Sequence, residues 1–365
     1  GPTSYGDSPY QSFSAYAGNP YFIDPVLLIE DGLLTEDEFA RHEVAGDEAS
    51  VDYAAVYNTR FDLLRCAFLR ARERDASAVA GFAAQNAAWL PDYALFMALK
   101  RHFGMKSWLL WDDADIRLRR PEALVRYGAL LAEDVAFFTY LQYLFFKQWE
   151  ALRAYARSKG VLMMGDMPIY VALDSADVWA TPENFQLDSS LCPTEVAGVP
   201  PDYFSATGQL WGNPLYRWDD MAKNGFAWWK ARVAGAARLY DTLRIDHFRG
   251  FESYWCVPAS ETTAVHGRWV KGPGVALVRA LREAAPQMDI IAEDLGYLDA
   301  DVRKLLAESG LPGMKVLEFA FDSREPSNYL PHTYPRNCVC YVGTHDNTPI
   351  MAWRHEAAPD DVAMA

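Results

Sequence analysis

Residues 161–166 read VLMMGD, a short apolar run that ends in an acid. The same pattern, an apolar run with a carboxylate at or near its C-terminal end, recurs at residues 243–246, 289–294, 315–322 and 338–346. Helical stretches separate several of these runs, for example residues 274–285 and 299–309. Short apolar strands that alternate with helices are typical of parallel β/α units. We therefore expect the second half of the chain to form part of a β/α-barrel.

The acids at the ends of these runs would lie at the C-terminal face of such a barrel, where β/α-barrel enzymes keep their chemistry. A single acid in this position is equally well explained as the N-cap of the following helix. Five acids in succession are difficult to explain as caps alone. The pattern therefore predicts an acidic site at the barrel mouth.

Glycoside cleavage needs one carboxyl group as proton donor and another as nucleophile or base. Asp246, Glu293 and Asp346 fit these roles, with the third acid holding the sugar and stabilising positive charge on its ring. Arg244 shares a strand face with Asp246, so we expect its charge to lower the pKa of Asp246. Burial and neighbouring carboxylates should raise the pKa of Glu293, as a proton donor requires.

Other interpretations of these residues remain open. Arg244 and Asp246 also fit a purely structural ion pair. His247 and His345 are candidate metal ligands, although the sequence contains no cluster with metal-ligand spacing.

Composition narrows the class of protein. The net charge of −15 argues against a nucleic-acid backbone as the partner and suits a neutral ligand. Aromatic residues make up 14% of the chain, and exposed rings suit the C–H faces of sugars. The five scattered cysteines predict reduced thiols in a cytoplasmic protein. No apolar run has the length of a membrane span.

Three segments are expected along the chain. Residues 1–32, rich in Gly, Pro and Tyr, predict an ordered loop segment at the top of the barrel, and residues 33–158 predict a helical insertion subdomain. Thr35, followed by Glu38, has the spacing of a helix N-cap, and Gly160 is expected to end the last helix. Residues 159–365 then form the catalytic barrel, with an active-site loop at 198–216.

Four motifs resemble those of a known family: GDMPIYV (165–171), LRIDHFRG (243–250), IAEDLG (291–296) and GTHDNT (343–348). Two further segments are more specific, GDSPYQSFSA (6–15) and the segment from PPDYFS (200–205) to QLWGNP (209–214). Over essentially the whole chain the sequence resembles the amylomaltases, the 4-α-glucanotransferases of glycoside hydrolase family 77 in the α-amylase superfamily.

The resemblance implies a (β/α)8 TIM-type barrel with a large helical insertion, and a retaining transfer of α-1,4-glucan segments between maltooligosaccharides. It implies Asp246 as nucleophile, Glu293 as acid/base and Asp346 as transition-state stabiliser. It further implies that sugar is bound by seven residues: Asp166, Arg244, His247, His345, Tyr10, Trp211 and, on a second glucan surface, Tyr5. The resemblance implies no cofactor, and calcium is not expected.

Family members start earlier and end later, so we expect strands three to seven of the eight-stranded barrel here, with both ends lacking. Transfer is favoured over hydrolysis when the glucosyl-enzyme is shielded from water, and the loop at 200–214, with Tyr203, Phe204 and Trp211, is a candidate lid that Gly208 and Gly212 would let move. Two alternatives remain open: an α-glucan hydrolase of the same superfamily, and a truncated, non-catalytic glucan-binding fragment.

Overall fold

The computed structural model describes residues 1–3, 5–42, 49–202, 205–296, 298–322, 327 and 329–365. These residues form two compact units. Unit 1 comprises residues 1–161, 170–217 and 257–266, and unit 2 comprises residues 162–169, 218–256 and 267–365. The chain thus passes between the units several times.

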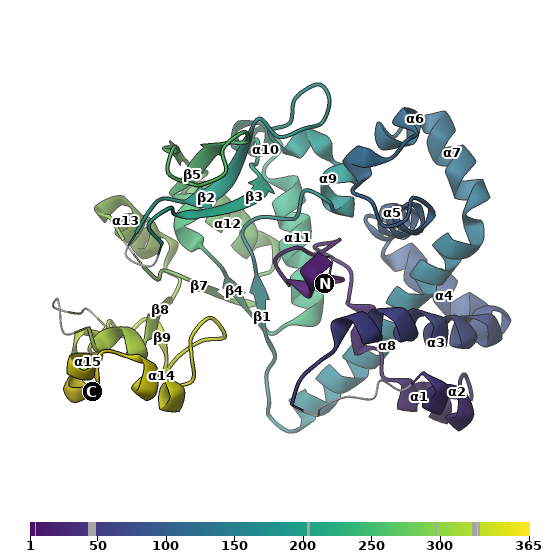
Figure 1. Cartoon of the computed structure of the whole chain (residues 1–365), viewed down its shortest axis with the longest axis horizontal. Coiled ribbons are helices and arrows are strands. Elements are labelled where there is room, and N and C mark those ends of the chain that lie inside the picture. Colours follow the sequence, from purple (N-terminus) through teal and green to yellow (C-terminus); the bar gives the residue numbers. More distant parts are fainter. Residues whose placement is uncertain (4, 43–48, 203–204, 297, 323–326, 328) are drawn as a thin grey trace. The chain divides into compact units, whose positions relative to one another are not determined.

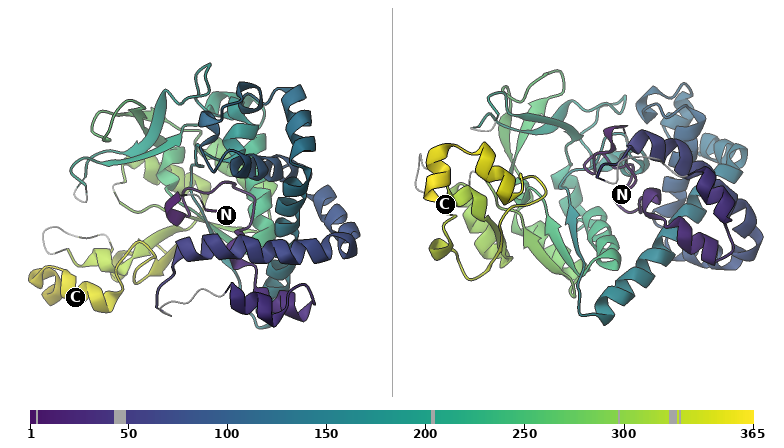
Figure 2. Two further views of the ribbon diagram at one scale, coloured as in Figure 1. Left: turned by 45° about the vertical axis from the view of Figure 1, so that its right-hand side comes forward. Right: turned by 60° about the horizontal axis from the view of Figure 1, so that its bottom comes forward.

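Unit 1 is mainly helical. The long helix α8 contacts α3, α4, α5 and α7 (Figure 2). Buried aromatic side chains of α8, such as Phe137 and Tyr140, contribute to the core of unit 1. The helices of this unit are α1 (Pro25–Glu30), α2 (Glu36–Arg41), α3 (Tyr53–Arg74), α4 (Ala76–Gln85), α5 (Leu90–His102), α6 (Ala114–Arg117), α7 (Pro121–Leu130), α8 (Ala132–Ser158) and α9 (Ala176–Ala180).

Local signals explain several helix ends. The Thr35 hydroxyl accepts from the Glu38 N–H at 3.2 Å, and Glu38 Oε2 accepts from the Thr35 N–H at 2.9 Å. This reciprocal capping box confirms the predicted start of α2. Gly160, with φ of 73°, follows the end of α8 in the left-handed conformation that commonly ends a helix. The prediction of a loop at residues 1–32 was wrong in part, because helix α1 forms there. It begins directly after its N-cap residue, Asp24.

Unit 1 also contains an antiparallel pair, β2 (Glu195–Val199) and β3 (Gln209–Pro214). The expectation of a loop at 198–216 was therefore wrong in part, because this range includes the end of β2 and all of β3. At Gly208 φ is 67°, and a Cβ there would approach the Val199 carbonyl oxygen to 2.3 Å, so glycine is required by the tight turn. Tyr203 and Phe204, which we expected in a lid, lie outside the described residues.

Unit 2 contains parallel strands that follow chain order (Figure 1). In one sheet β1 (Met164–Met167), β4 (Thr242–Ile245) and β7 (Asp289–Ala292) lie side by side, and β8 (Gly313–Val316) pairs in parallel with β9 (Cys338–Tyr341). The other α-helices and strands are α10 (Trp218–Lys223), α11 (Ala227–Leu239), β5 (Ser253–Pro258), whose last two residues belong to unit 1, β6 (Arg268–Lys271), α12 (Val275–Ala284), α13 (Ala300–Ser309), α14 (Ile350–Glu356) and α15 (Pro359–Met364).

Each of the five apolar runs therefore contributes a parallel strand, as the sequence predicted. The apolar run at 315–322 is a strand only in part. Strand β8 ends at Val316, and the chain then forms the 3-10 turn η6 (Leu317–Ala320). Helices α11, α12 and α13 lie in the connections between strands, with α11 packed against α12 and α12 against α13. This is the β/α pattern of a barrel wall.

All five cysteines are free thiols, as predicted. No single helix in the described part of the chain is long and apolar enough to cross a membrane, although α7 and α8, which meet at a bend of 82°, reach that length and composition when taken together.

Candidate active site

Backbone pairing in unit 2 brings the strand-end residues together. In the parallel pairing of β1 with β4, Asp166 lies opposite Arg244. The backbone hydrogen bonds between neighbouring strands continue one residue beyond the ends of β4 and β7. The Asp246 N–H donates to the Met167 carbonyl at 3.0 Å, and the Glu293 N–H donates to the Ile245 carbonyl at 3.0 Å. Asp246 and Glu293 therefore leave neighbouring strands at the same level and on the same edge of the sheet.

Arg244 joins two of the carboxylates. Its Nη1 lies 2.7 Å from both oxygens of Asp166 and 2.9 Å from Oδ1 of Asp246, and its side chain is only 6% exposed. The predicted pairing with Asp246 is confirmed, and the contact with Asp166 is an addition that sequence reasoning missed. Burial lowers the pKa of Arg244, but Asp166 and Asp246 raise this pKa by more than burial lowers it. The guanidinium therefore stays charged.

The pKa of Asp246 is raised, not lowered as expected. Burial is the largest cause, and the charges of Asp166 and Asp346 act in the same direction. Arg244 does lower the pKa of Asp246, in the expected sense, but its effect is outweighed. The expectation was wrong because it considered the strand neighbour and not the desolvation of the site.

Glu293 is held by backbone donors. Its Oε2 accepts from the His247 N–H at 2.8 Å and its Oε1 from the Leu295 N–H at 2.5 Å, while the residue is 9% exposed. Burial, followed by the charge of Asp246, raises the pKa of Glu293 from 4.5 to about 7. The predicted direction is confirmed, and the carboxyl group can both hold and release a proton near neutral pH.

His247 owes its place to an unusual backbone conformation. With φ of 52° and ψ of 47°, it lies in the left-handed region, which costs a non-glycine residue on the order of 1–2 kcal/mol. This conformation ends β4 and directs the His247 N–H at Glu293. Burial, aided by the charge of Arg249, lowers the pKa of His247 to about 3, so its imidazole is neutral at neutral pH.

Two predicted site residues, His345 and Asp346, follow β9, the last of the five parallel strands. His345 Nε2 lies 3.8 Å from Asp166 Oδ2 and 3.5 Å from Asp346 Oδ2. Both His345 and Asp346 are about half exposed. Since the charge of Asp346 also raises the pKa of Asp246, the four acidic strand ends share one site. The described residues contain no group of three or more His, Cys, Asp or Glu side chains arranged to hold a metal ion.

The other predicted contact residues belong to unit 1. Trp211 lies in β3, where its ring centroid is 6.2 Å from that of Tyr170 and its Nε1–H donates to Gln209 at 3.0 Å. Tyr10 is partly buried, and its N–H donates to the Ser8 hydroxyl at 3.3 Å. Tyr5 begins the turn η1 (Tyr5–Asp7), and its side chain lies outside the described part of the structure.

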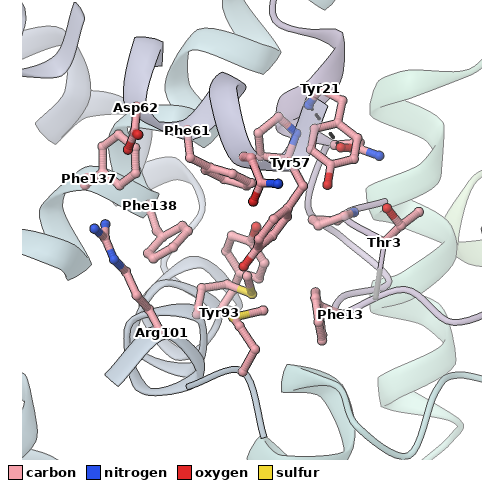
Figure 3. A pocket seen from close by; sticks show the side chains of 16 residues that line it. Thr3, Phe13, Tyr21, Tyr57, Phe61, Asp62, Tyr93, Arg101, Phe137 and Phe138 are labelled. Atoms are coloured by element: carbon pink, nitrogen blue, oxygen red, sulfur yellow. Dashed lines mark hydrogen bonds between the residues drawn. The ribbon is translucent and has the colours of Figure 1, made fainter. Parts of the chain in front are cut away.

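A cavity of about 230 Å³ also lies in unit 1 (Figure 3). Aromatic side chains from α3, α5 and α8 converge on it, among them Tyr57, Tyr93 and Phe138. None of the predicted site residues whose side chains are described lines it, so this cavity is distinct from the carboxylate cluster.

Comparisons with known proteins show the family of this chain. Residues 1–364 match a family model described as 4-alpha-glucanotransferase. The 4-alpha-glucanotransferase of Clostridium butyricum is 47% identical over 97% of this chain and 72% of that protein, and the Thermus thermophilus enzyme is 50% identical over 100% of this chain and 73% of that protein.

A solved structure gives the same result. Amylomaltase from Streptococcus agalactiae, determined in complex with acarbose, superposes with a TM-score of 0.95 and 44% identity. The match covers 99% of this chain and 74% of that protein, and confirms the expected TIM-barrel fold class. The chain therefore belongs to the 4-alpha-glucanotransferase family.

Proposed function

We propose that this protein transfers α-1,4-glucan segments by double displacement, with Asp246 as nucleophile, Glu293 as general acid and base, and Asp346 as stabiliser of the transition state. Family membership supports the overall reaction. The assignment of roles rests on the geometry and electrostatics of unit 2 together with the sequence resemblance.

In the first step, Glu293 donates its proton to the glycosidic oxygen while an Asp246 carboxylate oxygen attacks C1 of the sugar. The bond between C1 and the leaving oxygen breaks, and the shortened glucan departs with the proton. In the second step, the Glu293 carboxylate removes the proton from the 4-hydroxyl of an acceptor glucan. That oxygen attacks C1, and the bond to Asp246 breaks.

The raised pKa of Glu293, at about 7, is the observation that carries this assignment. A carboxyl group with this pKa is protonated often enough to donate and ionised often enough to accept, as both steps require. The charge of Asp246 helps to raise the pKa of Glu293. When Asp246 becomes esterified in the intermediate, that contribution disappears, so the pKa of Glu293 falls and its carboxylate becomes available as the base.

The remaining polar residues would bind the sugar at the cleavage point. Arg244 and His345 present N–H donors, and Asp166 presents acceptor oxygens to sugar hydroxyls. Neutral His247 serves in the same way without adding charge. In unit 1, we assign Tyr10 and Trp211 to stacking against glucan rings and Tyr5 to a second glucan surface, as the resemblance implies. We further propose a cytoplasmic location, in keeping with the free thiols.

The test is to incubate the purified protein with maltotriose and to chromatograph the products. We expect glucose together with a ladder of maltooligosaccharides longer than maltotriose. Asp246→Asn should lower this rate at least about 10³-fold, because it removes the nucleophile. A matched control is Asp289→Asn, since Asp289 is exposed and lies at the other end of β7 from Glu293.

The outcomes separate the alternatives. Shorter products alone would show a hydrolase, in which water takes the place of the acceptor. Binding of maltotriose without turnover would show a non-catalytic glucan-binding protein. Full activity in Asp246→Asn would disprove the assignment of the nucleophile.

A further inference from the structure

Glu318 is a buried carboxyl group that the proposed mechanism does not use. It lies in η6, two residues beyond the end of β8. The residue is 6% exposed, and within the described residues its Oε1 has no hydrogen-bond partner. A buried polar atom without a partner costs about 1–3 kcal/mol. Such an atom in a native protein calls for an explanation.

The contacts of Glu318 point to the turn that follows β9. The ladder between β8 and β9 ends with Val316 opposite Tyr341, and the Glu318 N–H then donates to the Val342 carbonyl at 3.1 Å. The carboxyl group lies against the next residue, Gly343. A Cβ built on Gly343 would lie 3.2 Å from Cδ, Oε1 and Oε2 of Glu318. Backbone and side chain of Glu318 thus both support residues 342–343.

Residues 342–343 lead directly to Asp346, the proposed catalytic acid that follows β9. Asn347 Oδ1 accepts from the Thr344 N–H at 2.9 Å and from its hydroxyl at 3.0 Å, and the Asp346 N–H donates to Thr344 Oγ1 at 3.2 Å. These bonds make residues 344–347 a braced turn. They connect Asp346 to Thr344, the residue that directly follows Gly343.

We propose that Glu318 is a positioning residue for glucan transfer, whose carboxyl group supports Gly343 and thereby fixes the turn that carries His345 and Asp346. This inference rests on the role proposed above for Asp346. Glu318 acts through its shape and its neutral form, and it does not touch the substrate. Burial raises the pKa of Glu318, which favours that neutral form.

The experiment measures kcat and KM for maltotriose transfer in Glu318→Ala and Glu318→Gln. Glu318→Ala removes the support, and we expect kcat to fall about 10–100-fold, since a displacement of about 1 Å at a catalytic group has effects of this size. The change in KM should be less than about threefold, because the interaction matters in the transition state and not in ground-state binding. Glutamine has the shape of a neutral glutamate, so Glu318→Gln should retain kcat to within about threefold.

Gly343→Ala tests the same contact from the other side. Its backbone is not in the left-handed region, so alanine adds only the close contact with the carboxyl group. We expect kcat to fall in Gly343→Ala and to recover in part when Glu318→Ala is added, because the methyl group then occupies the vacated space. This variant also keeps the test valid if Glu318→Ala does not fold.

Three results would overturn the proposal: wild-type kcat in folded Glu318→Ala, equal losses in Glu318→Ala and Glu318→Gln, or losses in the double variant that simply multiply. Asp346→Asn is measured in parallel. Activity retained in Asp346→Asn would mean that the proposed catalytic assignment fails. An inactive Asp346→Asn beside a fully active Glu318→Ala would mean that only the positioning role fails.

Discussion

The raised pKa of Glu293 should make the stability of this protein depend on pH. In the folded state Glu293 titrates at about 7, and the ordinary value of its pKa is 4.5. The folded state therefore binds the proton more tightly than the unfolded state. The stabilisation that results is complete at low pH and is lost as pH rises from about 4.5 to about 7.

The size of this effect follows from the two pKa values. At about 1.36 kcal/mol per pKa unit, the difference between 4.5 and about 7 corresponds to roughly 3 kcal/mol. Above neutral pH this is the cost of a buried, ionised Glu293. Glu293→Gln cannot ionise, so the variant should gain stability relative to the wild type as pH rises, while losing transfer activity.

The assay is urea unfolding of both proteins at about pH 5 and about pH 8.5. Glutamine turns its N–H₂ group toward one of the two backbone N–H donors and loses that hydrogen bond at either pH. This cost cancels when the two pH values are compared. We expect the free-energy difference between Glu293→Gln and wild type to move by about 2–3 kcal/mol in favour of the variant. A difference that stays constant within about 0.5 kcal/mol would refute the raised pKa and with it the main support for the acid/base role.

Other predictions follow from single contacts. Arg244→Met leaves two partly buried carboxylates unpaired, so it should abolish transfer and lower the free energy of unfolding by about 2–3 kcal/mol, measured by urea unfolding. Gly165→Ala should destabilise by about 1–3 kcal/mol, because a Cβ there would lie 2.2 Å from the Tyr240 ring; an unchanged thermal midpoint would contradict that packing. Thr35→Ala should cost about 1 kcal/mol through the lost capping box with Glu38 and leave kcat unchanged.

Features with local causes were predictable from the sequence. The parallel strands were predictable because their signals are local. The length of each apolar run, the acid that bounds it and the helices between the runs can all be identified from residues close together in the sequence. The capping box at Thr35 and the left-handed Gly160 likewise depend on contacts within a few residues. The edge on which Asp246 and Glu293 meet follows from strand direction alone, because all parallel strands end on the same side.

Sequence reasoning failed where distant segments set the outcome. The glycines and aromatic residues between 200 and 214 favoured a loop, but pairing with β2 makes residues 209–214 a strand. The strand neighbour Arg244 predicted a lowered pKa for Asp246, yet burial and two other carboxylates raise it. A sequence shows which charges are close along the chain, and it does not show how much water folding removes around them.

The amino-acid sequence specifies which residue types stand at the strand ends and in what order. Their interactions arise on folding: Arg244 is shared between Asp166 and Asp246, two backbone N–H groups donate to Glu293, and the Glu318 carboxyl group lies against Gly343. This is because hydrogen bonds and desolvation depend on distances of a few ångströms between segments far apart in the chain. Folding sets those distances, and residue spacing along the sequence does not.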